Sequence, residues 1–191
     1  MAARGETRQR MLDAALEVMR ERGAAGVTVD EVLARSGAPR GSVYHHFPGG
    51  RAQLLDETLT YAGESFTGML ERAARHGADA MLTRLVAFWT RVLEDSGFRA
   101  GCPVVPTAGA GGPEGAELAR KAADILAAWT RTIAAAFAAE GHSPAAADAL
   151  ATTVLSAISG AVGMCRALRS LDPLFQVAEQ CRTLLLTKSV P

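Results

Sequence analysis

The sequence predicts an all-α protein, and three observations support this fold class. Residues that favour helices, chiefly Ala, Leu, Glu and Arg, dominate the 191 residues. β-branched residues are scattered and do not alternate with polar ones, so no segment has the pattern of a half-buried strand. Hydrophobic residues make up 49% of the chain and charged residues 21%, which argues against disorder and fits a folded globular protein.

The first helix is expected from Glu6 to Arg22. Leu12, Leu16 and Met19 recur at helical spacing and therefore share one face. Gly23 follows the last apolar residue and ends the helix.

A short second helix is expected to begin after Thr28. Thr28 followed by Glu31 matches a capping box, in which the Thr hydroxyl accepts from a backbone N–H and the Glu carboxylate reaches back to the cap. Gly37 ends this helix after about two turns, because glycine readily adopts the left-handed conformation that closes a helix.

The third helix is expected to open at Pro39, where the missing N–H of proline costs nothing. Val43 and Phe47 lie four residues apart and point inward. The opposite side and the N-terminal end of this helix then carry Arg40, Gly41, Ser42, Tyr44 and His45.

Two short helices joined by a glycine turn form a helix-turn-helix. An exposed helix bearing Arg, Ser, Tyr and His has the size to enter a DNA major groove, where Arg can donate two hydrogen bonds to guanine while Ser and Tyr hold phosphates. Bulk charge adds little to this interpretation, because the net charge is zero and residues 1–51 hold eight Lys or Arg against six Asp or Glu.

The stretch TVDEVLARSGAPRGSVYHHFPGGRAQLL, residues 28–55, resembles the DNA-binding region of TetR-family transcriptional regulators. The spelling FPGG at 47–50 and GCPV at 101–104 is similar to the LmrA-like branch of that family. The resemblance implies approach to base edges by Arg40, Gly41 and Ser42. Backbone phosphates are implied for a second set: Thr28, Tyr44, His45 and His46.

One position departs from the family pattern. Most relatives have a lysine in the loop after Phe-Pro that touches phosphate, whereas this chain has Gly50 followed by Arg51. We expect Arg51 to take over that contact through a slightly longer loop. The resemblance then implies a DNA-binding domain over residues 1–52 and a larger helical domain for ligand binding and dimerisation over residues 53–191.

Long helices are expected in the second part of the chain. A fourth helix carries an apolar face that includes Leu55, Phe66 and Ala73 and runs out of the DNA-binding domain. Further helices are expected at Ala78–Asp95 and at 113–140, with a glycine-rich connector between them that lacks the strand and the Lys-Ser/Thr of a phosphate-binding loop.

Bulky side chains on these helices have two interpretations. Apolar stripes usually form core, yet aromatic rings and thioethers also line cavities between helices. The family resemblance implies a small-molecule inducer that releases DNA, and an apolar or aromatic inducer fits such walls. The candidates for its pocket are Met69, Phe88, Trp89, Cys102, Trp129 and Phe137.

The last two helices are expected to begin at a Ser143 cap and an Asp172 cap, each followed by proline. Both are apolar on more than one face, which predicts a two-fold homodimer through a four-helix bundle, although packing inside one chain is the alternative. Two subunits would read a palindromic operator in double-stranded DNA. The residues expected at the dimer interface are Ser156, Gly160, Gly163, Ala167, Leu174 and Cys181.

Other classes of protein fit the sequence less well. His76 and His142 stand alone, G-x-S-x-G is absent, and no His, Cys, Asp or Glu spacing suits a metal, so we expect no catalytic residues, metal or cofactor. No apolar run reaches the ~18 residues that span a bilayer, and the polar start MAARGETRQR is unlike a signal peptide. We expect a cytoplasmic protein with reduced thiols, no membrane partner, and no enzymatic activity.

Two other hypotheses remain open from the sequence. The first is a helical protein that binds small molecules or partners without touching DNA. The second is redox sensing through Cys102, the one cysteine placed in a loop, whereas Cys165 and Cys181 fall on apolar helical faces and are better explained by packing.

Overall fold

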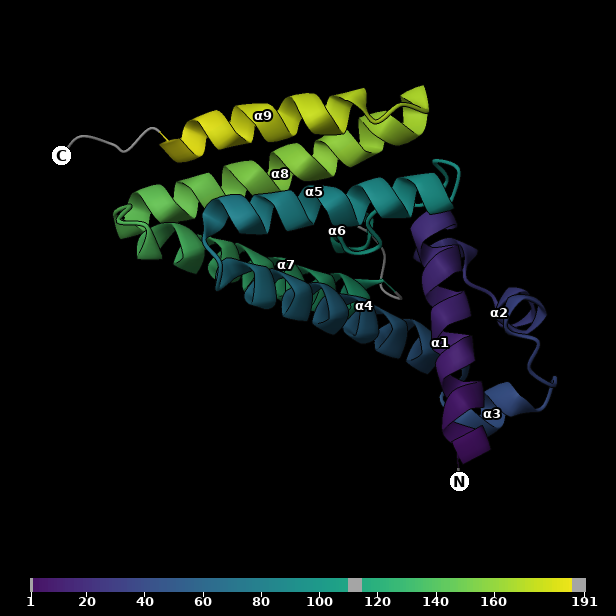
Figure 1. Ribbon diagram of the computed structural model, residues 1–191. Helices are drawn as coiled ribbons and strands as arrows, with labels where there is room; N and C mark the ends of the chain where they lie inside the picture. The colour runs from purple at the N-terminus through teal and green to yellow at the C-terminus, as the bar shows by residue number, and fades with distance from the viewer. Residues whose placement is uncertain (1, 110–114, 187–191) are drawn as a thin grey trace. The chain divides into compact units, whose positions relative to one another are not determined.

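A computed structural model describes residues 2–109 and 115–186, and every regular element in these ranges is a helix (Figure 1). The all-α prediction is confirmed. In chain order the elements are α1 (Ala2–Arg22), the 3₁₀ helix η1 (Ala24–Gly26), α2 (Val29–Ser36), α3 (Ser42–His46), α4 (Gly50–Ala74), α5 (Ala78–Asp95), α6 (Val104–Ala108), α7 (Ala116–Ala139), α8 (Pro144–Leu168) and α9 (Asp172–Leu186).

The chain divides into two compact units. One contains Met1–Glu64 with Pro103–Ala123, and the other contains Ser65–Cys102 with Asp124–Pro191. The long helices α4 and α7 each begin in the first unit and continue into the second. This division is by packing and differs from the functional boundary expected at residues 52 and 53, which stays a prediction.

The first unit has a core built from α1. Met11, Ala15 and Val18 on this helix are fully buried, and α1 packs against α2. Phe47 and Leu54 are fully buried in the same unit. These side chains give the short helices α2 and α3 a surface to rest on, which isolated helices of that length require.

The start of α2 confirms half of the predicted capping box. The Thr28 Oγ1 accepts a hydrogen bond from the Glu31 N–H at 3.2 Å, and Gly37 closes the helix with φ of 64°. The expected return contact is corrected, because the Glu31 carboxylate accepts from Arg35 Nε at 2.9 Å and also lies 3.4 Å from Arg22 Nη1. Two nearby guanidinium groups are stronger partners for a carboxylate than one backbone N–H.

Helix α3 begins later than predicted. Pro39 forms a turn in which its carbonyl accepts from the Ser42 N–H at 2.8 Å, and regular helix runs only from Ser42 to His46. The predicted inward face is confirmed, since Val43 and Phe47 are both 0% exposed.

In the second unit α5, α8 and α9 lie side by side (Figure 1). The predicted bounds of α5 and the Ser143 cap of α8 are confirmed, with Ser143 Oγ accepting from the Ala146 N–H at 3.3 Å. Asp172 is not the cap of α9, because the Leu171 carbonyl accepts the first helical hydrogen bonds and Ser170 Oγ accepts from the Asp172 N–H.

The expected connector contains a helix that the sequence pattern does not reveal. Helix α6 is only five residues long, and Thr107 within it is buried, its hydroxyl donating to the Pro103 carbonyl at 2.7 Å. Residues 110–114 of the glycine-rich stretch lie outside the described residues.

Helix α8 is long and apolar enough to cross a membrane by length and composition. An 18-residue window within it has a mean hydropathy of 1.5, although only 33% of that window is buried inside the protein. Ala, Gly, Ser and Thr interrupt the larger apolar residues, which is why the sequence has no continuous apolar run of this length. One face of this apolar helix therefore packs on α5 and α9, and another face is exposed to solvent.

We predict that Gly37→Ala lowers the free energy of unfolding by about 1 kcal/mol, because the left-handed conformation costs residues with a Cβ about that much. Urea unfolding followed by circular dichroism measures it. Gly41→Ala is the matched control, since Gly41 has φ of −75° and open space around a Cβ. Equal stability of the two variants would contradict the assignment of Gly37 as the helix stop.

Candidate nucleic-acid interface

Helix α3 presents a polar and aromatic surface to solvent. The Tyr44 side chain is 65% exposed, and Arg40, Gly41 and His45 are exposed as well. Ser42 and His46 are half-buried, and the rings of the two histidines meet edge to face with centroids 5.1 Å apart. Every residue expected on this helix is therefore at least partly accessible to a macromolecular partner.

Thr28 is exposed at the N-terminus of α2. Its hydroxyl is already engaged as the helix cap, yet the exposed backbone N–H groups of a helix start attract anions such as phosphate. Thr28 lies in the same unit as α3, and the phosphate contact expected of it stays a prediction.

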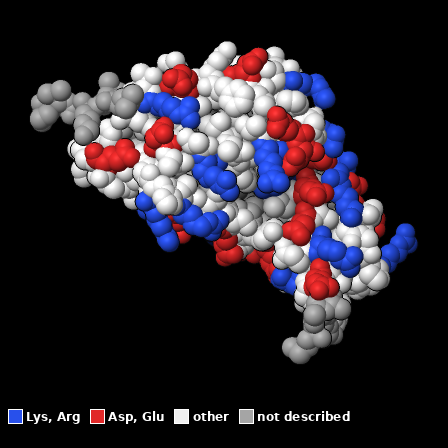
Figure 2. Space-filling view, in the orientation of Figure 1, with Lys and Arg blue, Asp and Glu red and all other residues white. Residues whose placement is uncertain are grey.

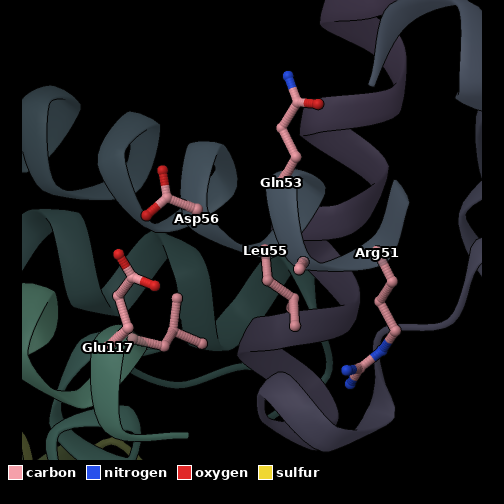
Figure 3. A pocket seen from close by; sticks show the side chains of 7 residues that line it. Arg51, Gln53, Leu55, Asp56 and Glu117 are labelled. Atoms are coloured by element: carbon pink, nitrogen blue, oxygen red, sulfur yellow. The ribbon is translucent and has the colours of Figure 1, made fainter. Parts of the chain in front are cut away.

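The exposed Arg51 side chain is hydrogen-bonded within its own unit. Its Nε donates to the Val27 carbonyl at 2.6 Å and its Nη2 donates to the Ala24 carbonyl at 2.8 Å. In Figure 3 the Arg51 side chain points away from Asp56 and Glu117. The guanidinium thus bonds the Val27 carbonyl just after η1 and adds a second donor to the Ala24 carbonyl, which already accepts from the Val27 N–H at 3.2 Å. Arg51 therefore has a structural role, and the phosphate contact expected of this exposed side chain stays a prediction.

Most arginines of the first unit are likewise held by the protein. Arg35 donates to Glu21 at 2.8 Å and to Glu31, and its hydrogen bond to the Glu21 carboxylate raises the pKa of Arg35. Arg40 has no ion-pair partner among the described residues, so its charge is available on the turn before α3. Figure 2 shows positive and negative side chains interspersed on the visible face, with no continuous basic patch.

The second unit gathers aromatic side chains from three helices. The Phe66 ring of α4 lies 4.4 Å from the Trp129 ring of α7 and 5.2 Å from the Phe88 ring of α5. Trp89 completes the group at 6.0 Å from Phe66, and Trp129 Nε1 donates to Thr67 Oγ1 at 3.1 Å. We call these four rings the aromatic cluster. It contains three of the expected pocket residues, Phe88, Trp89 and Trp129. They surround Phe66, which was expected on the apolar face of α4 but not in a pocket.

The remaining pocket candidates lie apart from those ring contacts. Phe137 is 1% exposed and packs against the His142 ring with centroids 6.1 Å apart. Met69 is buried, one turn beyond Phe66 on α4, and Cys102 is half-buried in the segment after α5. The sequence could not separate Phe137 and Met69 from the clustered rings, because all of them were predicted as bulky residues on apolar helical faces.

Two surface clefts have other linings. One, of about 570 Å³, lies in the first unit between the starts of α4 and α7 and includes Asp56, Leu118 and Glu117 (Figure 3). The other, of about 630 Å³, lies in the second unit between α5 and α9 and includes Val86, Phe175 and Arg182. Neither contains a residue of the aromatic cluster.

The expected dimer residues fall into two groups. Ser156, Gly160, Gly163 and Ala167 are exposed along the open face of α8. Leu174 and Cys181 are 0% and 2% exposed, so the expectation that they lie on a pairing surface is corrected. They face the core of their own unit, where burial raises the pKa of the Cys181 thiol and of the Cys165 thiol. Both cysteines are free and buried, in keeping with the packing role expected for them.

Two short helices that meet at a glycine turn, the second with an accessible polar face over two fully buried side chains, define a helix-turn-helix DNA-binding protein. Comparison with known families agrees. Residues 11–58 match the bacterial regulatory proteins of the tetR family, and residues 78–180 match the C-terminal domain of LmrA/YxaF-like transcriptional regulators. The chain belongs to the TetR family and is a DNA-binding transcriptional regulator of the LmrA/YxaF-like kind, not an enzyme.

Individual relatives support the same family. An HTH-type transcriptional regulator of Mycobacterium tuberculosis (strain ATCC 25618 / H37Rv) is 39% identical over 186 residues, which is 95% of either chain. YxaF of Bacillus subtilis is 24% identical over 98% of this chain and all of its own. Among solved structures, a regulatory protein TetR from Rhodobacter sphaeroides has a TM-score of 0.79 at 25% identity, covering 92% of this chain and 97% of its own.

We predict that Arg40→Ala weakens binding to a duplex from upstream of the protein's own gene by about tenfold or more, because an Arg that donates two hydrogen bonds to guanine contributes about 1–3 kcal/mol. Fluorescence anisotropy at fixed salt measures it. Arg91→Ala on α5 removes the same charge from a side chain that is 84% exposed in the other unit and should leave the affinity unchanged. Equal affinities of the two variants would remove Arg40 from the interface.

Proposed function

We propose that this regulator is a repressor that binds a palindromic operator as a homodimer and is released by a small apolar or aromatic inducer. The observation that carries the proposal is the accessible polar face of α3, fixed by Val43 and Phe47 beneath it. Repression, release by an inducer and action on DNA in the cytoplasm are what membership of the family suggests.

The open face of α8 supports the homodimer. A Cβ added at Gly160 or Gly163 would meet no atom within 4 Å, so packing inside the subunit does not require glycine at either position. Beside them Met164 and Leu168 are 55% and 63% exposed, which is costly for large apolar side chains in water. A second copy of α8 against this face would bury both side chains, and the glycines would let the two helices approach closely.

The aromatic cluster supports an apolar inducer. Its rings come from α4, α5 and α7. The hydrogen-bonded Trp129 indole N–H and Thr67 hydroxyl place a polar pair beside these apolar side chains. A ligand that enters between these rings must separate helices that are otherwise packed together. We infer that the rearrangement passes along α4, whose N-terminal end follows α3 directly in the chain.

A contact between α4 and α7 within the first unit supports this route. Lys121 of α7 forms an ion pair with Asp56 of α4, and its Nζ also donates to Thr60 Oγ1 at 2.9 Å. Both helices also contribute to the aromatic cluster in the second unit. Displacement of α4 by an inducer, or of α7 through Lys121, would therefore move the helix that follows α3 in the chain. In a dimer this would misalign the two α3 helices, which must lie about one DNA turn apart to bind both half-sites.

Release by an inducer is tested by titrating apolar aromatic compounds into the protein with and without the upstream duplex. Trp89 and Trp129 are the two tryptophans of the chain and both belong to the aromatic cluster, so intrinsic fluorescence reports occupancy. The proposal requires reciprocal coupling: a bound compound must lower the protein's affinity for DNA by the same factor by which bound DNA lowers the protein's affinity for that compound. A compound that binds tightly and leaves DNA affinity unchanged, or wild-type protein that gives no shift at low salt, overturns it.

We predict that Gly160→Leu converts the dimer to a monomer and lowers operator affinity by about a hundredfold or more, since one half-site provides few contacts. Sedimentation equilibrium measures the first effect and anisotropy the second. Thr152→Leu, on an exposed position earlier in the same helix, is the control for an added apolar side chain. A folded dimer in Gly160→Leu would place the interface elsewhere.

We predict that Lys121→Met keeps the affinities for DNA and for inducer when each is measured alone, but reduces their coupling by about fivefold, against the 5- to 150-fold coupling typical of allosteric proteins. The measurement is the DNA titration repeated at saturating inducer. Arg131→Met removes a cation from an exposed position on the same helix and should retain full coupling. Full coupling in Lys121→Met as well would exclude this contact from the route.

A further inference from the structure

A chain of contacts connects α1 to the loop that follows α3, which we call the recognition helix. Arg8 of α1 forms an ion pair with Glu57 of α4. The other Glu57 oxygen, Oε1, accepts from Gln53 Nε2 at 2.8 Å, and Gln53 Oε1 accepts from the Gly49 backbone N–H at 2.8 Å. All four residues belong to the first compact unit.

The same arginine touches the recognition helix by a second route. The Arg8 guanidinium carbon lies 5.0 Å from the centre of the Phe47 ring, within the range of a cation–π contact. Phe47 is fully buried and ends α3, and its backbone N–H donates to the Val43 carbonyl at 2.6 Å. Arg8 therefore reaches both Phe47, which caps α3, and, through Glu57 and Gln53, the loop beyond it.

The loop is shaped for this contact. A Cβ at Gly49 would lie 3.1 Å from the Gln53 Cβ and 3.2 Å from its Oε1, so a larger residue would force Gln53 to move. Gly50 follows with φ of 62° and donates its N–H to the Phe47 carbonyl at 2.8 Å. The end of α3 and the start of α4 are thus joined by a turn that the Gln53 side chain holds from outside.

We propose that Arg8, Glu57 and Gln53 are positioning residues for DNA recognition, which fix the orientation of α3 within the first unit. The inference rests on the DNA-binding face proposed above. In this arrangement none of the three need touch DNA. Glu57 is informative, because a carboxylate in a module that binds a polyanion opposes binding by charge alone. Its contacts with Arg8 and Gln53 give it a role that can be tested separately from that repulsion.

This reasoning gives the substitution Glu57→Gln two opposite expectations. If Glu57 acts only through its charge, its removal tightens binding to every duplex, because binding that does not depend on sequence is set by phosphate charge. If Glu57 positions α3, removal weakens binding to the operator by about tenfold and leaves or slightly improves binding to unrelated DNA. Base readout depends on the fit of a few side chains in the groove, whereas the phosphate attraction does not.

The experiment compares affinities for two duplexes at several salt concentrations. The first comes from upstream of the protein's own gene, and the second has the same length and base composition in shuffled order. We expect Glu57→Gln to lower the ratio of the two affinities about tenfold. Glu64→Gln is the matched control: it makes the same charge change two turns further along α4, at an exposed side chain with no ion-pair partner among the described residues, and should keep the wild-type ratio.

Two further variants separate positioning from loss of fold. Gln53→Met removes the hydrogen bonds to Gly49 and Glu57 without changing charge, and we expect the same fall in the affinity ratio with an unchanged salt slope. Arg8→Lys keeps the charge but not the planar group over Phe47, and we expect a partial fall. If Glu57→Gln loses its helical signal in circular dichroism, Gln53→Met decides.

The outcomes distinguish this inference from the function it rests on. Wild-type protein that binds both duplexes equally weakly overturns the proposed DNA-binding face itself. Wild-type protein that prefers the upstream duplex, together with folded Glu57→Gln and Gln53→Met variants of wild-type ratio, overturns only the positioning network. A fall in the ratio in both variants, with Glu64→Gln unchanged, supports it.

Discussion

The burial of Val43 and Phe47 is the constraint on which the DNA-binding half of the protein depends. Helix α3 has five residues and one regular turn, far below the length at which a helix is stable in water. Its conformation is therefore set by these two fully buried side chains and not by its own hydrogen bonds. Because they lie four residues apart on one face, Tyr44 and His45 must face the other way.

The elements around α3 restrain it from several directions. Gly37 ends α2 before it, and Arg51 anchors the start of α4 to the carbonyls of Ala24 and Val27. On α4 two neighbouring carboxylates serve different contacts, since Asp56 pairs with Lys121 of α7 and Glu57 pairs with Arg8 of α1. One turn of α4 thus contacts both α7 and α1.

Helix periodicity and caps could be predicted from the sequence because they depend on neighbouring residues. The bounds of α5, the Thr28 and Ser143 caps and the inward direction of Val43 all follow from spacing along one helix. The acceptors of a long side chain could not be predicted, because Arg51 and Glu31 each have several partners within reach and tertiary packing selects among them. Leu174 and Cys181 were misplaced for a related reason: a helix that is apolar on two faces does not reveal which face its own subunit covers.

The aromatic contacts of the second unit could not be predicted from the sequence pattern. Aromatic residues spaced along α5 and α7 could be identified as bulky, but only the packing of the helices shows that Phe66 lies among Trp129, Phe88 and Trp89 while Phe137 pairs with His142. Helix α6 escaped notice because a single turn has no periodicity to detect.

The pairing of arginines with acidic neighbours has a consequence for how the protein searches a genome. With Arg8, Arg22 and Arg35 neutralised by carboxylates of their own unit and a net charge of zero for the whole chain, little positive charge remains to hold the protein against arbitrary sequence. We infer that such a regulator gains little from sliding along the double helix and finds its target mainly by repeated three-dimensional encounters. Occupancy in the cell would then be governed by the number of free molecules and less by a reservoir stored on the chromosome.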